Sequence, residues 1–311
     1  MGAVLVSGCL SWSDARRASR VEIPAVNPVP SHRQARQPRQ PRELAPRLPE
    51  RIVCLTEEST ETLYLLGEQR RIVGISGFTV RPPQARREKP RVSAFTSANI
   101  DRIVALRPDL VLGFSDLQAD IARELIGRGI EVWISNQRSV AEILGYVLRL
   151  GAMVGAPRRA QRLVAGWQAG FERLRRQAAA WPRRPRVYFE EWDQPMICGI
   201  RWVSELIALA GGDDVFADLA EGALGAQRII ADADEVPRRA PEIIVGSWCG
   251  KKFQPARVAA RPGWQDIPAV RGGQLHEIKS PLILQPGPAA LSDGVHALAA
   301  IFAQWQHSHP V

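Results

Sequence analysis

Short apolar runs alternate with amphipathic stretches along residues 51–155. Residues 52–55 are apolar without a break, which is typical of a strand buried on both faces of a parallel sheet. Three more strands are expected, at residues 72–75, 109–113 and 132–134. Helices are expected at residues 59–66, 99–107, 116–128 and 139–154. This alternation predicts a parallel sheet with helical crossovers, and the polar stretch 76–98 is expected to be a long loop.

Residues 157–180 carry one unbroken apolar stripe at helical spacing. Pro157 suits the first position of a helix, and Pro182 and Pro185 follow its expected end. The apolar positions are 160, 163, 164, 167, 171, 174 and 178. A helix over this range is about 36 Å long, which is longer than one crossover needs. The pattern predicts a strut between two lobes.

The pattern after residue 183 repeats the theme of the first lobe. Strands are expected at residues 186–189, 243–246 and 274–278, and helices at 202–210 and 288–305. The predicted fold class is α/β, with two Rossmann-like lobes that have parallel sheets and are joined by one long α-helix. The expected divisions are a disordered Pro/Arg-rich leader (1–50), an N-terminal lobe (51–155), the connecting helix (156–182) and a C-terminal lobe (183–306).

One segment of the chain is repeated. Residues 99–113 align without gaps on residues 232–246, and both segments read as a helix, a proline and a strand. The matched pairs are Asp101 with Asp234, Pro108 with Pro241, and Gly113 with Gly246. The repeat predicts that the two lobes are structurally equivalent.

The net charge of +9 is unevenly placed, because eight arginines lie in the first 50 residues. Those arginines alternate with proline and glutamine, and no nucleic-acid-binding module accompanies them, so a nucleic-acid partner is not expected. No apolar run approaches the roughly 18 residues that a membrane span requires. Seven prolines between residues 24 and 49 favour a flexible linker.

The four cysteines form no C-x-x-C pair, so a zinc knuckle is not expected. Residues 6–9, Val-Ser-Gly-Cys, have the pattern of a lipoprotein cleavage box with Cys9 as the lipidated residue. The stretch before it lacks a basic region, so the leader is either a truncated lipoprotein signal or an unstructured segment. Cys54 is expected in the core. Cys198 and Cys249 are expected in loops, either free or paired.

The sequence contains no motif of a nucleotide-binding or hydrolytic enzyme. It has no G-x-G-x-x-G, no P-loop and no G-x-S-x-G, and of its five histidines only His276 lies near the expected cleft, within a strand. A Glu57/Glu191 acid–base pair would suit a cytosolic enzyme, but no nucleophile or metal set accompanies it. We expect a binding protein that is not an enzyme, with no covalent cofactor and no metal site.

Several segments resemble the periplasmic binding proteins for iron–siderophores and vitamin B12. They are residues 51–56 with Thr60 and Glu61, 73–76 with Pro82 and Pro83, 99–111, and Gly211 with Gly212. The resemblance covers about residues 51–306 as one binding domain. It implies a substrate-binding component of an ABC importer that holds its ligand between two lobes and delivers it to a membrane permease and its ATPase subunits.

Within that family the resemblance points to the cobalamin-binding branch, with a ferric-siderophore binding protein as the alternative. Phe78, Phe95 and Phe114 fall where the aromatic side chains that face the corrin would align. Flat rings cover a large apolar face at little entropic cost. The resemblance also implies a periplasmic, monomeric protein, lipid-anchored at Cys9 if the leader is a truncated signal and cytoplasmic if it is not.

The second lobe is expected to contribute aromatic and basic residues to the cleft. They are Trp192, Trp202, Arg228, Trp248, Lys251, Lys252, Lys279 and Gln285. The two lysines after the strand at 243–246 favour an anionic ligand, although they equally fit a solvated surface. Four carboxylates, Glu57, Glu58, Glu190 and Glu191, are expected to follow the first strand of each lobe. We expect them to form ion pairs with Arg81, Arg201 or the lysines, rather than a metal site.

The repeated acids have a second implication. In the resembling proteins, one exposed acid in each lobe meets arginines on the two halves of the permease. Asp101 matches that position in the first lobe, and Asp234, with its neighbour Glu235, matches it in the second. The alternative is that both aspartates only stabilise the positive ends of their helices.

Overall fold

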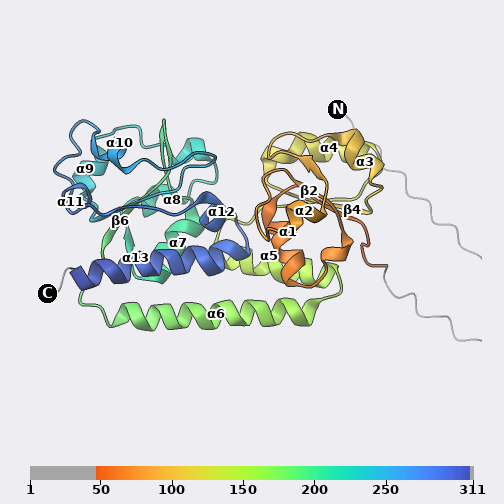
Figure 1. Cartoon of the computed structure of the whole chain (residues 1–311), viewed down its shortest axis with the longest axis horizontal. Helices are drawn as coiled ribbons and strands as arrows, with labels where there is room; N and C mark the ends of the chain where they lie inside the picture. Colours follow the sequence, from red (N-terminus) through yellow and green to blue (C-terminus); the bar gives the residue numbers. More distant parts are fainter. Residues whose placement is uncertain (1–46, 309–311) are drawn as a thin grey trace, which may run out of the picture. The chain divides into compact units, whose positions relative to one another are not determined.

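The computed structural model of the chain describes residues 47–308 (Figure 1). Residues 1–46, with most of the expected leader and Cys9, lie outside the described residues. Among residues 47–308, no helix is both long enough and apolar enough to cross a bilayer.

Five parallel strands form the first sheet. They are β1 (Ile52–Cys54), β2 (Ile72–Ser76), β3 (Arg91–Ser93), β4 (Leu110–Phe114) and β5 (Val132–Ser135), in the order β3-β2-β1-β4-β5. The expectation of one long loop over 76–98 is wrong, because this stretch holds α2 (Ala85–Glu88) and the edge strand β3. With only one apolar residue in three, β3 has no hydrophobic run to reveal it.

Helices cover both faces of this sheet (Figure 1). They are α1 (Glu57–Leu65), α3 (Ile100–Ala105), α4 (Ala119–Gly127) and α5 (Val140–Met153). Because side chains alternate along a strand, Ile52 and Cys54 enter the core beneath α1 and α5, whereas Val53 and Leu55 enter the core with Ile103 of α3. Every residue of β1 is therefore buried, which explains its uninterrupted apolar sequence.

The long helix α6 (Pro157–Ala179) is continuous, so the expected strut is confirmed (Figure 1). Its first half buries Ala160 and Val164 in the core of the first lobe. Its second half buries Phe171 and Leu174 in the core of the second lobe. One amphipathic helix thus closes the base of both lobes.

The second sheet is mixed rather than purely parallel. Its strands are β6 (Arg186–Asp193), β7 (Met196–Cys198), β8 (Asp213–Asp214), β9 (Ile243–Gly246) and β10 (Leu275–Glu277). The order is β10-β9-β6-β7, with β8 beside the start of β6, and the β6–β7 pair is antiparallel. Since β6 extends to residue 193 and turns back as a hairpin, Cys198 lies in a strand and not in the expected loop.

The remaining helices belong to the second lobe. They are α7 (Arg201–Ala210), α8 (Ala217–Ala220), α9 (Glu235–Arg239), α10 (Pro255–Ala259), α11 (Pro268–Arg271), α12 (Ser280–Ile283) and α13 (Val295–Ser308), the last preceded by a π-helical turn over Ala290–Gly294. The α/β fold with two lobes and a connecting helix agrees with the prediction. The exact domain boundaries stay a prediction.

The base of the two lobes shares one core. Val140 and Ile143 of α5 pack in the same cluster as Leu206 of α7 and Phe302 of α13. Glu205 of α7 also accepts a hydrogen bond, at 2.6 Å, from the backbone N–H of Val140. The described residues of both lobes form one compact unit.

Candidate ligand-binding site

Each strand of the first sheet ends beside at least one candidate residue, and all of these lie at the same edge. All five strands are parallel, so their carboxyl ends meet there, which is where open α/β sheets bind ligands. Phe78 follows β2, Phe95 follows β3, and Phe114 is the last residue of β4. Phe78 is 57% exposed, Phe95 is half-buried and Phe114 is buried. Phe78 is therefore the predicted aromatic residue most accessible to a ligand.

Arg138, which follows β5, completes this edge and was missed by the sequence analysis. Its guanidinium carbon lies 4.8 Å from the centre of the Phe114 ring, in a cation–π contact. Burial lowers the pKa of Arg138; Asp116 opposes this, and Arg228 of the second lobe adds to it. The sequence could have revealed Arg138, because it lies three residues past the end of a strand. The three phenylalanines were found by the same pattern, since each lies at or just past a strand end.

Glu57 and Glu58 open α1 at the end of β1. Glu58 is 1% exposed and accepts a hydrogen bond from the Thr56 hydroxyl. A second-lobe segment lies on it, since a Cβ added to Gly287 would be 2.4 Å from the Glu58 Cβ. Burial raises the pKa of Glu57 to about 8 and that of Glu58 to about 7.

The expected ion pairs of these two carboxylates are not formed. Among the ion pairs of residues 47–308, none includes Glu57 or Glu58. Arg81 instead pairs with Glu61, at 2.9 Å, and with Asp293 of the second lobe, at 2.8 Å. The expectation failed because α1 turns Glu61, one helical turn further on, toward Arg81.

Glu190 and Glu191 lie within β6, not after it. They do form ion pairs, as expected, but with arginines other than those named. Arg261 donates to Glu190 at 2.9 Å, and Arg228 donates to Glu191 at 2.6 and 3.0 Å. Arg228 is only 2% exposed, so this pairing fixes the turn that precedes residue 229 onto β6 and β7.

Lys251 is exposed and contacts two tryptophans and an aspartate. Its Nζ lies 4.1 Å from the Trp192 ring centre and 5.0 Å from that of Trp248, and it pairs with Asp193. Burial is the largest single influence on the pKa of Asp193 and raises it. The hydrogen bond and the charge of Lys251 act in the opposite direction, and the pKa is lowered on balance. The structure thus brings three of the predicted residues together: Trp192, Trp248 and Lys251.

Two of the predicted tryptophans are core residues. Trp202 is 4% exposed, packs inside the shared core and donates its Nε1 proton to the Ile283 carbonyl at 2.9 Å. Trp248 is 3% exposed, and its Nε1 donates to Glu190 at 2.9 Å. Their indole groups pack inside the protein and donate internal hydrogen bonds. Among the predicted aromatic residues, Phe78 is exposed, and Phe95 and Trp192 are half-buried.

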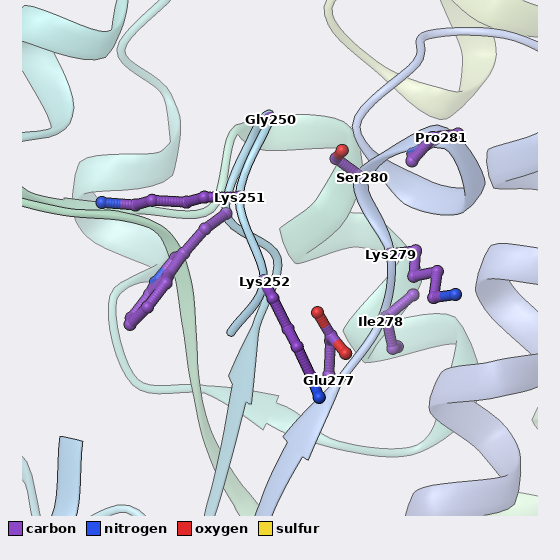
Figure 2. A pocket seen from close by; sticks show the side chains of 9 residues that line it. Gly250, Lys251, Lys252, Glu277, Ile278, Lys279, Ser280 and Pro281 are labelled. Atoms are coloured by element: carbon purple, nitrogen blue, oxygen red, sulfur yellow. The ribbon is translucent and has the colours of Figure 1, made fainter. Parts of the chain in front are cut away.

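A cavity of about 640 Å³ lies at the carboxyl ends of β9 and β10 (Figure 2). Its lining includes Trp248, Lys251, Lys252, Lys279 and Glu277. Figure 2 shows Lys252 and Lys279 extending from two neighbouring segments of the chain. No ion pair joins either lysine to an acid among the described residues. With Lys251 paired to Asp193, the two remaining lysines outnumber the one lining carboxylate, Glu277, so the cavity lining carries a net positive charge.

A second cavity, of about 600 Å³, lies between residues of the two lobes. Tyr64, Leu65 and Pro83 line it from the first lobe, and Lys279 and Leu282 from the second. Lys279 borders both cavities. The predicted Gln285 is half-buried and borders neither.

The three predicted docking acids lie at helix starts. Asp101 is exposed in the first turn of α3, and Arg128 lies 3.4 Å from it. Asp234 precedes α9 and is exposed. Glu235 is half-buried and pairs with Arg238 and Arg239. Asp101 and Asp234 thus remain available to a partner.

The described residues contain no grouping of three or more side chains suited to a metal ion. Cys54, Cys198 and Cys249 are all free thiols, and only Cys249 is exposed. The pKa of the Cys249 thiol is raised by burial and then by the carboxyls of Glu57 and Glu191. Glu57 belongs to the first lobe and Glu191 to the second, so the two candidate edges approach each other at this point.

Curated proteins similar to this chain include a transporter component and a vitamin-binding protein. The chain is 24% identical to an uncharacterised ABC transporter substrate-binding lipoprotein of Bacillus subtilis, over 96% of this chain and 93% of that protein. It is also 24% identical to a vitamin B12-binding protein of Vibrio parahaemolyticus, over 78% of this chain and 86% of that protein.

The fold has solved counterparts too. A periplasmic heme-binding protein of Pseudomonas aeruginosa superposes with a TM-score of 0.70 at 23% identity, over 82% of this chain and 93% of that chain. The sequence profile of the periplasmic binding proteins matches residues 52–282, which is most of the chain. Proteins of this family serve ABC transporters as carriers that catalyse no reaction, so the expectation of a non-enzyme is confirmed. The chain belongs to the periplasmic binding protein family.

Proposed function

We propose that this chain captures cobalamin, or a related corrinoid, between its two lobes and delivers it to the permease of an ABC importer. The observation that carries the proposal is the exposed Phe78 ring at the carboxyl edge of the first sheet, the edge at which the strands next to Phe95 and Phe114 also end. A corrin is a broad, largely apolar disc, and an exposed aromatic ring covers such a face without losing much side-chain entropy. The similarity to a vitamin B12-binding protein supports this choice.

The electrostatics of the cleft support a ligand that carries negative groups on its periphery. Lys252 and Lys279 border the cavity of Figure 2 without acidic partners among the described residues. This favours a second candidate, a ferric siderophore with carboxylate groups. A corrinoid and a siderophore differ in shape. Binding of a corrinoid requires the exposed Phe78 ring, whereas binding of a carboxylate siderophore depends mainly on Lys252 and Lys279.

A spectral titration separates these candidates. The purified protein is mixed with aquocobalamin, cyanocobalamin, hemin and a carboxylate siderophore loaded with iron, and the retained colour is measured after gel filtration. We expect stoichiometric retention of a corrinoid with its chemical identity unchanged. Retention of the siderophore alone would replace the first candidate with the second, and retention of none of the four would contradict both.

The variant Phe78→Ala tests whether the exposed Phe78 ring binds the ligand. We expect this variant to weaken corrinoid binding by about 1–3 kcal/mol, the range for a buried aromatic anchor in a complex. Its urea unfolding curve should stay unchanged, because the ring is exposed in the free protein. Ile126→Ala is the control, since Ile126 is 61% exposed on α4, away from the carboxyl edge. Equal affinity of Phe78→Ala and the unaltered protein would remove Phe78 from the site.

We further propose that the protein is monomeric and works outside the cytoplasm, with Cys9 as its lipid anchor. The similarity to a substrate-binding lipoprotein supports the anchor. Labelling cells with a radioactive fatty acid tests it: the label should appear on the unaltered protein and be missing from Cys9→Ser. Recovery of the protein in the cytoplasmic fraction, without label, would contradict this proposal.

A further inference from the structure

Helix α6 carries a straight row of arginines on its outer face. Arg158, Arg162, Arg173 and Arg176 are all exposed. At 100° per residue they fall within a sector of about 60°, and Arg158 and Arg176 lie five turns apart, about 27 Å along the axis. The buried residues of the helix point the opposite way. We call these four residues the α6 arginine row.

The row is not neutralised by the protein. None of its four arginines forms an ion pair among the described residues. The acid on α6, Glu172, pairs with Arg175, which lies outside the row. The outer positions between the two arginine pairs are Ala165, Gly166 and Ala169. Small side chains there leave the guanidinium groups free to reach outward.

Helix stability does not account for the row. Arginines three or four residues apart repel each other on a helix surface, as Arg158 and Arg162 do, and Arg173 and Arg176. The helix is held by its inner face, through Val164 and Phe171. Because the inner face is buried, every exposed arginine of α6 lies on its outer half, but only these four fall within the 60° sector.

We propose that the α6 arginine row docks the protein on the surface of an anionic phospholipid bilayer. Figure 1 draws α6 at the margin of the described residues, so a flat surface can approach its whole length. Guanidinium groups bind phosphates through paired hydrogen bonds, and aligned basic residues are attracted to anionic lipids. The proposal does not depend on which ligand the cleft takes.

Vesicle co-sedimentation of the full chain tests the proposal. The vesicles are phosphatidylcholine, with or without phosphatidylglycerol, at low and at raised salt. We expect binding to the anionic vesicles only, weakened by salt. The variant R158Q/R162Q/R173Q/R176Q should bind at least about ten-fold more weakly, because each basic residue near an anionic surface contributes several-fold in affinity. The same four positions changed to lysine should keep most of the binding.

A matched control removes the same charge elsewhere. R70Q/R86Q/R87Q/R123Q changes four exposed arginines of the first lobe, and it should bind anionic vesicles as the unaltered protein does. The leader arginines are present in every variant, so the difference between the two quadruple variants reports on α6. The proposal would be overturned if both quadruple variants lost binding equally, or if the protein bound neutral and anionic vesicles equally. Binding to RNA without binding to vesicles would also overturn it. Circular dichroism and the corrinoid titration show whether each variant is folded.

Discussion

Glu57 and Glu58 show how burial changes the pKa of single carboxyl groups. Where α1 begins, Glu57 is half-buried, and Glu58 is buried and covered by the segment around Gly287. Neither has an ion pair among the described residues, so burial favours their protonated forms. Their pKa values in the folded protein, about 8 and about 7, lie above the ordinary 4.5.

The pH dependence of stability follows from these values. A carboxyl whose pKa is higher in the folded state binds more protons there, so the free energy of unfolding falls as the pH rises from about 4.5 to about 8. Each pH unit between the two pKa values corresponds to about 1.4 kcal/mol. Urea unfolding at pH 5 and pH 8 should show this fall, and Glu57→Gln and Glu58→Gln should each flatten it. The exposed Glu131→Gln should leave the slope unchanged; no difference between the three variants would contradict the pKa assignment.

Single residues also mark what a sequence can reveal about the site. Residues that follow strand ends could be named in advance, and the structure places Phe78 after β2 and Lys279 after β10. Whether a ring faces the cleft or the core depends on distant neighbours. Trp202 and Trp192 read alike in sequence, yet Trp202 is fixed by the Ile283 carbonyl, 81 residues away along the chain.

At the scale of elements, the long periodic segments were predictable and the short ones were not. The 23-residue α6 shows its full apolar stripe, whereas β3 and β7 have three residues each. Three residues are too few to show an alternating pattern. Missing β7 also hid the hairpin, so Glu190 and Glu191 were expected after β6 and not within it.

The loop after β9 depends on one glycine. A Cβ on Gly246 would lie 1.8 Å from the Phe253 ring, so any side chain there displaces the segment that carries Trp248 and Lys251. We expect Gly246→Ala to lower the free energy of unfolding by about 1–3 kcal/mol, as overpacking does, and to weaken ligand binding. The measurements are urea unfolding and the corrinoid titration.

Gly145→Ala is the control for that change. Gly145 lies inside α5, and a Cβ there meets no atom within 4 Å. Alanine is the better helix former, so this variant should gain up to about 1 kcal/mol and bind ligand normally. If both variants behave alike, the close approach of Phe253 does not decide the loop structure.

For the whole molecule, the repeat extends to backbone details. Arg107 and Ala240 occupy matched positions, and both have positive φ, at 47° and 42°. Matched acids also do the same work: Asp109 accepts a hydrogen bond from the backbone of Arg51 before β1, and Glu242 accepts one from that of Arg186 at the start of β6. Such correspondence supports two equivalent lobes.

Equivalent lobes suit a partner with two equivalent halves. We therefore expect Asp101→Arg and Asp234→Arg to reduce docking to the permease, because charge complementarity sets orientation and association rate. Ligand affinity should be unchanged, since both residues are exposed at helix starts away from the cavities. Docking is measured as binding to the permease in detergent or nanodiscs, and ligand affinity is measured by the corrinoid titration. Normal docking of both variants would leave the aspartates as helix-terminal charges only.

The separation of the two sheets has a consequence for how the chain is made. No strand is exchanged between them, so every pairing of the first sheet uses residues 52–135 and can form before residue 186 is synthesised. Val140 and Ile143, however, pack against α7 and α13, which are made later. A half-made chain therefore has a finished sheet and an uncovered apolar base. That base is the surface where we expect a chaperone to hold the growing protein until the final helix arrives.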